Sequence, residues 1–348
     1  MITIFLIVSC GKQKNKVDQS ASLNREKLNI IVIFMDDLDF DELNVYDNDL
    51  YPCYTGAHNH GYPISNEGIY FNSSRLYMPN IDKLAREGAV FTRFYTPSSV
   101  CTPARYSILT GRYASKSPGF LKQFPANTTA NIRWNTPLLP DEPNIAKSMK
   151  ELGYTTGIIG KWHNELNGKI AITPKSYEDL KDSALSRQIA SDYEYIIDYL
   201  EDSIGFDHAA RICYDNPRVM NLEWVTEGAI EFIDENKSRP FYLYLPLPFP
   251  HAQYNKFADW DILATPAGMI DEEPAGQMTF KEACRINRFK LLDKRKSMGT
   301  YLDDCVGAIC RKLDELDISD NTLIIITSDQ QSRGKFTTYE SCLIPCIM

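Results

Sequence analysis

Four apolar runs along the chain lead into polar, chemically capable side chains. The runs are residues 29–35, 156–160, 241–245 and 323–328. Continuous apolar runs of this length are typical of strands that are buried on both faces of a mostly parallel sheet. The polar residues that follow them are Asp36-Asp37, Lys161-Trp162-His163, Pro250-His251 and Asp329-Gln330.

Helical spacing separates these runs. Apolar side chains recur every three or four residues at Ile81, Leu84 and Ala85, at Ile145, Met149 and Leu152, and along residues 298–316. Gly153 follows the second pattern, where a C-cap glycine belongs. Strands that alternate with helices predict a layered α/β fold with right-handed crossovers.

The carboxyl ends of the four runs predict a site. Ligands of open α/β sheets bind beyond the carboxyl ends of the strands, so carboxylates, a lysine and two histidines would meet at one edge. Polar residues also follow strands as turn formers and helix caps, and a single such end would mean little. Four ends with complementary chemistry favour a functional site.

Composition narrows the class of protein. The 348 residues are 43% hydrophobic and 24% charged, which is ordinary globular usage, and the net charge is −9. An acidic chain lacks the basic footprint of a nucleic-acid binder. The nine cysteines form no C-x-x-C pair, so a structural zinc site is not expected, and most cysteines are expected to be buried small hydrophobes.

The N-terminus predicts a lipid anchor. An apolar run ends at Ile7-Val8-Ser9-Cys10, which resembles the lipobox of a bacterial lipoprotein signal. We expect residues 1–27 to be signal and polar tether, with Cys10 acylated and the protein in the periplasm or at the cell surface. That anchor would be the chain's contact with a membrane. The run is short and no Lys or Arg precedes it, so a frayed N-terminus or a misplaced start codon is the alternative.

The sharpest local feature surrounds Cys101. Pro103 suits the first turn of a helix, which would place Cys101 just before the helix N-terminus, where free N–H groups favour an anion. Arg105 lies on the first turns and could reach back. Cys101 could therefore be an activated nucleophile; a buried structural cysteine is the alternative.

Cys101-Thr102-Pro103-Ala104-Arg105 followed by Leu109-Thr110-Gly111-Arg112 resembles the signature of type I sulfatases, in the alkaline phosphatase superfamily. Further short motifs in the expected order are Asp36-Asp37, Met78 to Ala85, Gly88 to Thr92, Gly160 to His163, Pro250-His251, Thr327 to Asp329 and Gly334 to Glu340. The resemblance implies an alkaline-phosphatase-like layered α/β/α domain over residues 28–348. It also implies a C-terminal subdomain, which is expected to be missing because the chain stops at Met348.

The resemblance implies a metal and a modified cysteine. Asp36, Asp37, Asp329 and Gln330 match the ligands of one divalent cation, usually calcium, in keeping with the oxygen ligands that hard cations take. Gln330 departs from the family, where Asn or His is usual. A maturation enzyme would convert Cys101 to formylglycine, whose hydrate is the nucleophile.

Further roles carry over from the family. Arg105 would hold the hydrate together with the metal, and His163 would hydrogen-bond it and serve as the base. His251 would be the general acid for the leaving alcohol. Lys161 and Lys335 would contact the sulfate oxygens.

Other polar residues match no catalytic position. His58, His60 and His208 fit no motif and either line the pocket or lie on the surface. The pair Asp303-Asp304 resembles the family's structural helix and is not counted among the metal ligands.

The expected function is hydrolysis of sulfate monoesters, with sulfated carbohydrate as the substrate. One alternative is a phosphodiesterase or phosphonate monoester hydrolase of the same superfamily. The other is an inactive, truncated homologue that binds sulfated glycan. Rates on an aryl sulfate and a matched phosphodiester separate the two enzymes.

Overall fold

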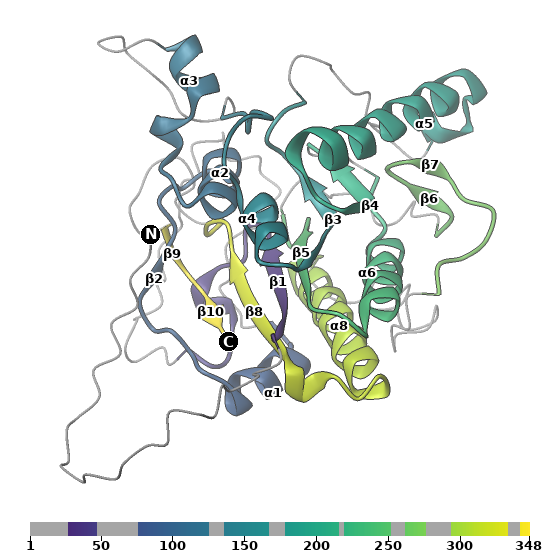
Figure 1. The fold of residues 1–348 in the computed structure, drawn as a ribbon. Helices are drawn as coiled ribbons and strands as arrows, with labels where there is room; N and C mark the ends of the chain where they lie inside the picture. The colour runs from purple at the N-terminus through teal and green to yellow at the C-terminus, as the bar shows by residue number, and fades with distance from the viewer. Residues whose placement is uncertain are drawn as a thin grey trace, which may run out of the picture.

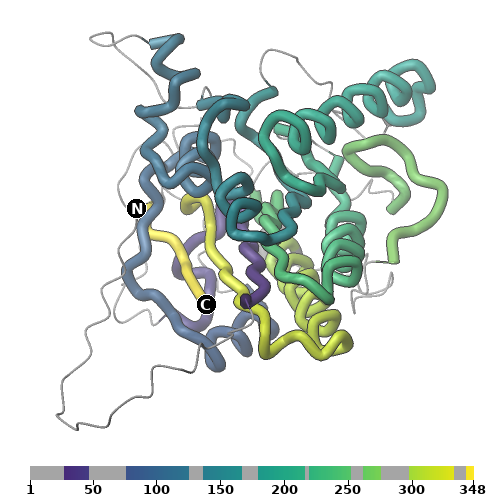
Figure 2. The backbone as a smooth tube through the Cα atoms, in the orientation of Figure 1, coloured from purple at the N-terminus to yellow at the C-terminus, as the bar shows by residue number. Residues whose placement is uncertain are grey.

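A mostly parallel sheet forms the centre of the molecule (Figure 1). The computed structural model describes residues 27–46, 76–124, 136–166, 178–215, 219–251, 262–275, 294–332 and 342–348, with the side chains of 294–297 left out. Within these residues the strand order is β10 (Cys346–Ile347), β8 (Thr322–Ser328), β1 (Asn29–Met35), β5 (Phe241–Leu247), β3 (Thr155–Trp162) and β4 (His208–Tyr214). β10 runs antiparallel to β8, and the other neighbours are parallel. Figure 2 shows the purple β1 and the yellow β8, from opposite ends of the chain, side by side.

Helices cover both faces of this sheet. One face carries α1 (Pro79–Glu87), α6 (Leu222–Asn236) and α8 (Lys294–Glu315), and the other carries α2 (Cys101–Thr110), α4 (Ile145–Glu151) and α5 (Ser183–Asp198). Each face of the sheet forms a hydrophobic core with its helices: the first core lies under α1, α6 and α8, and the second under α2, α4 and α5. Because successive strand residues point to opposite faces, Ile33 of β1 lies in the first core and Phe34 in the second. The two cores give the expected three-layer architecture.

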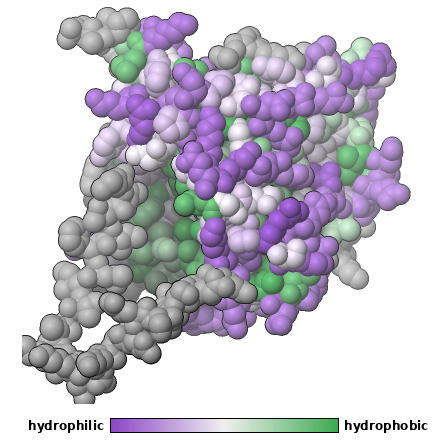
Figure 3. Space-filling view, viewed as in Figure 1, coloured by the Kyte–Doolittle hydropathy of each residue, from purple (hydrophilic) through white to green (hydrophobic). Residues whose placement is uncertain are grey.

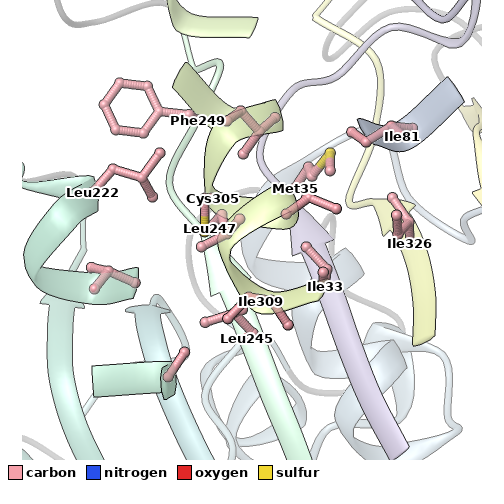
Figure 4. Packing of buried hydrophobic residues seen from close by; sticks show 14 of the residues in the cluster. Ile33, Met35, Ile81, Leu222, Leu245, Leu247, Phe249, Cys305, Ile309 and Ile326 are labelled. Carbon is pink, nitrogen blue, oxygen red and sulfur yellow. The ribbon is translucent and has the colours of Figure 1, made fainter. Parts of the chain in front are cut away.

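The first core is built mainly from branched aliphatic side chains. Figure 4 shows Cys305 and Ile309 of α8 beside Ile33, Leu245 and Leu247 of the central strands. Cys305 is fully buried, and burial raises the pKa of its thiol to about 12, so it is an uncharged packing residue as the sequence predicts. On the face of the molecule that Figure 3 shows, hydrophilic side chains predominate, with smaller hydrophobic areas between them.

Most predicted elements are confirmed, with shifts at their ends. The four apolar runs become β1, β3, β5 and β8, and the three helical patterns become α1, α4 and α8. Gly153 follows α4 with φ +81°, a conformation that glycine adopts without steric cost. β3 continues through Trp162, so Lys161 lies inside the strand rather than after it. α2 begins at Cys101, so this cysteine belongs to the first turn instead of preceding the helix.

The remaining elements are short or carry a polar pattern. The structure adds η1 (Phe40–Glu42), η2 (Ala114–Lys116), α3 (Pro118–Gln123), η3 (Glu178–Lys181), the π-helical η4 (Tyr199–Ile204), η6 (Ser319–Asn321) and the strand pairs β2 (Phe94–Tyr95) with β9 (Leu343–Ile344) and β6 (Ala264–Thr265) with β7 (Gly268–Met269). Among the helices in the described ranges, none has the length and apolar character that a membrane span requires. The predicted lipobox and Cys10 lie outside the described residues.

Candidate active site

The predicted acidic residues meet at the carboxyl edge of the sheet. β1 and β8 are parallel neighbours whose last residues, Met35 and Ser328, are paired. The residues that follow, Asp36-Asp37 and Asp329-Gln330, therefore leave the sheet side by side. Two backbone N–H groups, those of Asp37 and Gln330, donate to Asp329 Oδ1 at 3.0 and 2.9 Å. The two strand ends are thus fastened to each other by one carboxylate.

Two buried cations lie against these carboxylates. Arg105 of α2 places Nη2 3.2 Å from Asp36 Oδ1 and 3.1 Å from Asp329 Oδ2. Lys161 of β3 places Nζ 2.6 Å from Asp36 Oδ2. All four side chains are at most 1% exposed, so the charges face one another with little solvent screening.

The two aspartates respond in opposite ways to this environment. Burial disfavours the ionised form of Asp36, but Lys161, His251 and Arg105 outweigh it and hold the pKa of Asp36 well below its usual range. Burial and the neighbouring charge of Asp36 raise the pKa of Asp329, and Arg105 opposes them. Burial also works against the charge of Arg105, yet Asp36 and Asp329 raise its pKa, so the guanidinium stays positive.

Cys101 faces the same cluster from the first turn of α2. It is completely buried, and Gln330 Nε2 donates to its Sγ at 3.2 Å. Asp36, Asp37, Cys101 and His251 offer ligand atoms that all lie within 4.8 Å of one another. His251 Nε2 is 3.5 Å from Asp37 Oδ2. The elements α2, β1, β5 and β8 therefore converge on one buried group of side chains.

The side chains of this group suit a hard cation. Asp36, Asp37 and Asp329 bring three carboxylates, whereas Arg105 and Lys161 bring two fixed positive charges. Gln330 Oε1 is buried and accepts no hydrogen bond from the described residues, while Nε2 of the same amide donates to Asp37 Oδ1. Rotating the amide would turn Oε1 toward the Asp37 carboxylate, an approach of two oxygens that a bound cation stabilises.

His163 lies beside this cluster and contacts Asp215, a residue that the sequence analysis did not identify. Its Nε2 is 2.8 Å from Oδ1 of Asp215. Burial and the charge of Lys161 lower the pKa of His163 to about 4, although Asp215 acts in the opposite direction. The imidazole is therefore neutral at pH 7, with a hydrogen on one of its two ring nitrogens. Asp215 follows β4 directly, as His163 follows β3, but the apolar pattern of the sequence does not predict β4, so it gives no signal for Asp215.

The structure places the other predicted residues as follows. His208 begins β4 at the opposite edge of the sheet, where its ring lies 5.6 Å from the ring of Phe232, so it is not part of the site. Asp303 lies on α8 and accepts hydrogen bonds from the first residues of α1. Lys335, His58 and His60 lie outside the described residues.

Comparison with known proteins gives a family. The family model described as "Sulfatase" matches residues 28–335. An N-acetylgalactosamine-6-O-sulfatase of Bacteroides thetaiotaomicron is 24% identical over 391 aligned positions, which cover 94% of this chain and 62% of that protein. An ulvan-active sulfatase of Formosa agariphila is 25% identical over 267 positions, 75% of this chain and 47% of that protein. This chain thus spans less than two thirds of the length of these curated relatives.

Solved structures confirm the fold. A structure from work on the metabolism of multiple glycosaminoglycans by Bacteroides thetaiotaomicron matches with a TM-score of 0.53 and 21% identity. The match covers 92% of this chain and 72% of that chain. The layered α/β domain with a mostly parallel sheet, expected from the alkaline phosphatase superfamily, is confirmed.

Proposed function

The chain belongs to the sulfatase family, and from that membership we propose that it hydrolyses sulfate monoesters of carbohydrates. The observation that carries the proposal is the burial of Cys101 among Asp36, Asp37 and His251, with Arg105 held by Asp36. A plain packing cysteine has no need of so many buried charges, each of which is costly to remove from water. The names of two relatives, which refer to N-acetylgalactosamine-6-O-sulfate and to ulvan, support a sulfated glycan as the substrate class.

The proposal includes a modified residue and a metal ion. Conversion of Cys101 to formylglycine would provide a hydrated aldehyde whose hydroxyl attacks sulfur. Calcium, held by the oxygens of Asp36, Asp37, Asp329 and Gln330, would supply positive charge that lowers the pKa of that hydroxyl.

The chain's own charged residues then have distinct tasks. Arg105 and Lys161 bring fixed positive charges into a site with little water, where they stabilise the negative charge of the reacting sulfuryl group. We propose that Lys335, like Lys161, contacts the sulfate oxygens. These interactions need no reorganisation during the reaction because Asp36 already fixes both Arg105 and Lys161.

The two histidines handle the protons. His163, neutral at pH 7, would accept a proton from the modified side chain of Cys101 during release of sulfate. His251, 3.5 Å from the carboxylate of Asp37, donates a proton to the leaving alcohol. The pair thus separates acid and base functions between two strand ends.

We also propose the location inferred from the sequence. Acylation at Cys10 would hold the enzyme at the cell surface or in the periplasm, where polymeric sulfated carbohydrates are accessible. The mass of the N-terminal peptide of native protein tests this: a lipid-modified Cys10 as first residue supports it, and an unprocessed peptide that begins at Met1 contradicts it.

One experiment tests the enzymatic proposal. Protein made in the native host, or with a maturation enzyme, is digested with trypsin, and the mass of the peptide from Phe94 to Arg105 is measured. We expect the formylglycine form, together with release of sulfate from sulfated glycans and faster turnover of an aryl sulfate than of a matched phosphodiester. The Cys101→Ser variant is the control, which should lack both the aldehyde mass and turnover by this route. An unmodified Cys101 under competent conditions, or a preference for the phosphodiester, contradicts the proposal.

A further inference from the structure

The ends of β3 and β4 bring His163 and Asp215 together. The two strands are parallel neighbours, and their last residues, Trp162 and Tyr214, are paired. The next residue on each strand is therefore directed to the same position beyond the sheet edge. A backbone bond reinforces this, since Asp215 N–H donates to the carbonyl oxygen of Trp162 at 2.8 Å.

An irregularity in β4 decides which residue lies opposite His163. Ile159 pairs with Ala210, but Lys161 pairs with Cys213, so β4 contains one additional residue at this point. Without that insertion His163 would lie opposite Tyr214 instead of Asp215. A bulge that redirects a side chain at a sheet edge is a common device beside functional sites.

The bulge is stabilised by its own contacts. Arg211 has φ +52°, a conformation that costs energy for a residue with a Cβ. Its Nη2 lies 3.1 Å from Glu227 Oε2 and 3.2 Å from Glu231 Oε2 of α6, and its guanidinium is 5.3 Å from the ring centroid of Trp224. These ion pairs and the ring contact hold the irregular backbone in place.

Asp215 reaches His163 from the rim of the site. Its carboxylate is 54% exposed, whereas His163 is 8% exposed, and the two are joined by the 2.8 Å contact between Oδ1 and Nε2. Asp215 itself has φ +58°, which Asp tolerates better than most residues. A carboxylate facing one ring nitrogen determines which nitrogen of a neutral imidazole carries the hydrogen.

We infer that Asp215 is a positioning residue that accepts a hydrogen bond from Nε2–H of His163 and thereby selects the tautomer with Nδ1 unprotonated. Nδ1 is then the nitrogen that accepts the proton during sulfate release. Only this catalytic use rests on the proposed function, because the tautomer is a property of the folded chain before any modification of Cys101.

Nitrogen NMR of the full chain measures the tautomer directly. The protein has five histidines, so histidine-selective ¹⁵N labelling gives few signals, and the His163→Gln variant identifies those of His163. At pH 7 we expect the wild type to show a protonated Nε2 and an unprotonated Nδ1. In Asp215→Gly, which keeps a residue able to adopt positive φ, we expect a mixture of the two tautomers.

The chain offers a matched control. Asp317 also has positive φ, at +55°, and is exposed near the amino end of β8, away from the site. Asp317→Gly should leave the His163 signals unchanged. An Nδ1–H tautomer in the wild type, or the wild-type tautomer retained in Asp215→Gly, overturns the inference, and the wild-type spectrum alone decides if that variant does not fold.

Activity of the matured protein provides the second readout. Asp215→Gly should lower kcat about 10–100-fold, the range for loss of a residue that orients a catalytic group, with a smaller change in KM. An unchanged kcat overturns the positioning role. If the wild type releases no sulfate while the tautomer depends on Asp215, the proposed function fails and the structural inference stands.

Discussion

Two pairs of adjacent aspartates are buried in this molecule, and their surroundings give them different tasks. Asp36-Asp37 follows β1 at the carboxyl edge of the sheet, and Asp303-Asp304 lies on α8. Each of the four side chains is 3% exposed or less. Sequence adjacency and burial are therefore the same in both pairs, and neither property distinguishes a metal site from a structural one.

The neighbours make the distinction. Asp36 contacts Lys161 and Arg105, whose charges hold its pKa low. Asp303 instead accepts hydrogen bonds from the backbone N–H groups of Asn80 and Ile81 at 3.0 and 2.9 Å, at the first turn of α1. Burial raises the pKa of Asp303 to about 6 even though these bonds oppose it. The first pair is suited to bind a cation, and the second caps a helix.

The largest effect is expected from Asp36→Asn. Removing this carboxylate leaves Arg105 and Lys161 buried with one anion fewer, and breaking a buried ion pair in this way typically costs about 3–5 kcal/mol of unfolding free energy. Chemical denaturation measures the loss. Asp141→Asn, at an exposed aspartate, is the matched control and should remain close to wild type.

A double substitution separates charge from packing. Asp36→Asn combined with Lys161→Met removes both members of the 2.6 Å pair, so it should recover part of the lost stability. Equal instability of the single and double variants would mean that the unpaired charge of Lys161 is not the cause.

Removal of the divalent cation should have the next largest effect. A ligand present at 100 times its Kd stabilises the folded state by about 2.7 kcal/mol, so a chelator should lower the melting temperature and calcium should restore it. The same shift should persist in Asp303→Asn and disappear in Asp329→Asn. A shift that survives in Asp329→Asn would place the cation elsewhere.

The sequence revealed the strands that are buried and continuous, and with them most of the site. β1, β3, β5 and β8 have uninterrupted apolar cores, and the polar residues at their carboxyl ends meet because parallel neighbours end at the same edge. β4 was not predicted because His208 and Arg211 interrupt its apolar character. The sequence pattern of β4 alone does not show that α5 and α6 pack against this strand.

The sequence also did not predict the contacts that depend on how the strands are ordered and paired in the sheet. Lys161 and Asp36 are 125 residues apart, and their 2.6 Å contact follows from the strand order β1-β5-β3. Asp215 faces His163 because of one additional residue in β4, and the residue types of a strand that was not predicted do not locate that bulge. The residue types at the strand ends thus predicted the chemistry of the site, whereas the contacts between those residues could be identified only in the structure.

The smallest effect, from Asp303→Asn, completes the comparison. Because an amide offers one acceptor oxygen to the N–H groups of Asn80 and Ile81, we expect the unfolding free energy to fall by about 1 kcal/mol at pH 7, typical of a weakened helix cap. Sulfate release should be unchanged.

The same substitution should also change the pH dependence of stability. The pKa of Asp303 rises from 3.8 to about 6 on folding, so the folded state binds more protons than the unfolded state. The contribution of Asp303 to the unfolding free energy of the wild type therefore increases as the pH falls through that range. The variant lacks this contribution, and its deficit should therefore be larger at pH 5 than at pH 7 by about 1 kcal/mol. Denaturation of both proteins at the two pH values measures the difference. A deficit that shrinks at pH 5 would instead assign Asp303 the behaviour of Asp36, a carboxylate that the fold keeps ionised.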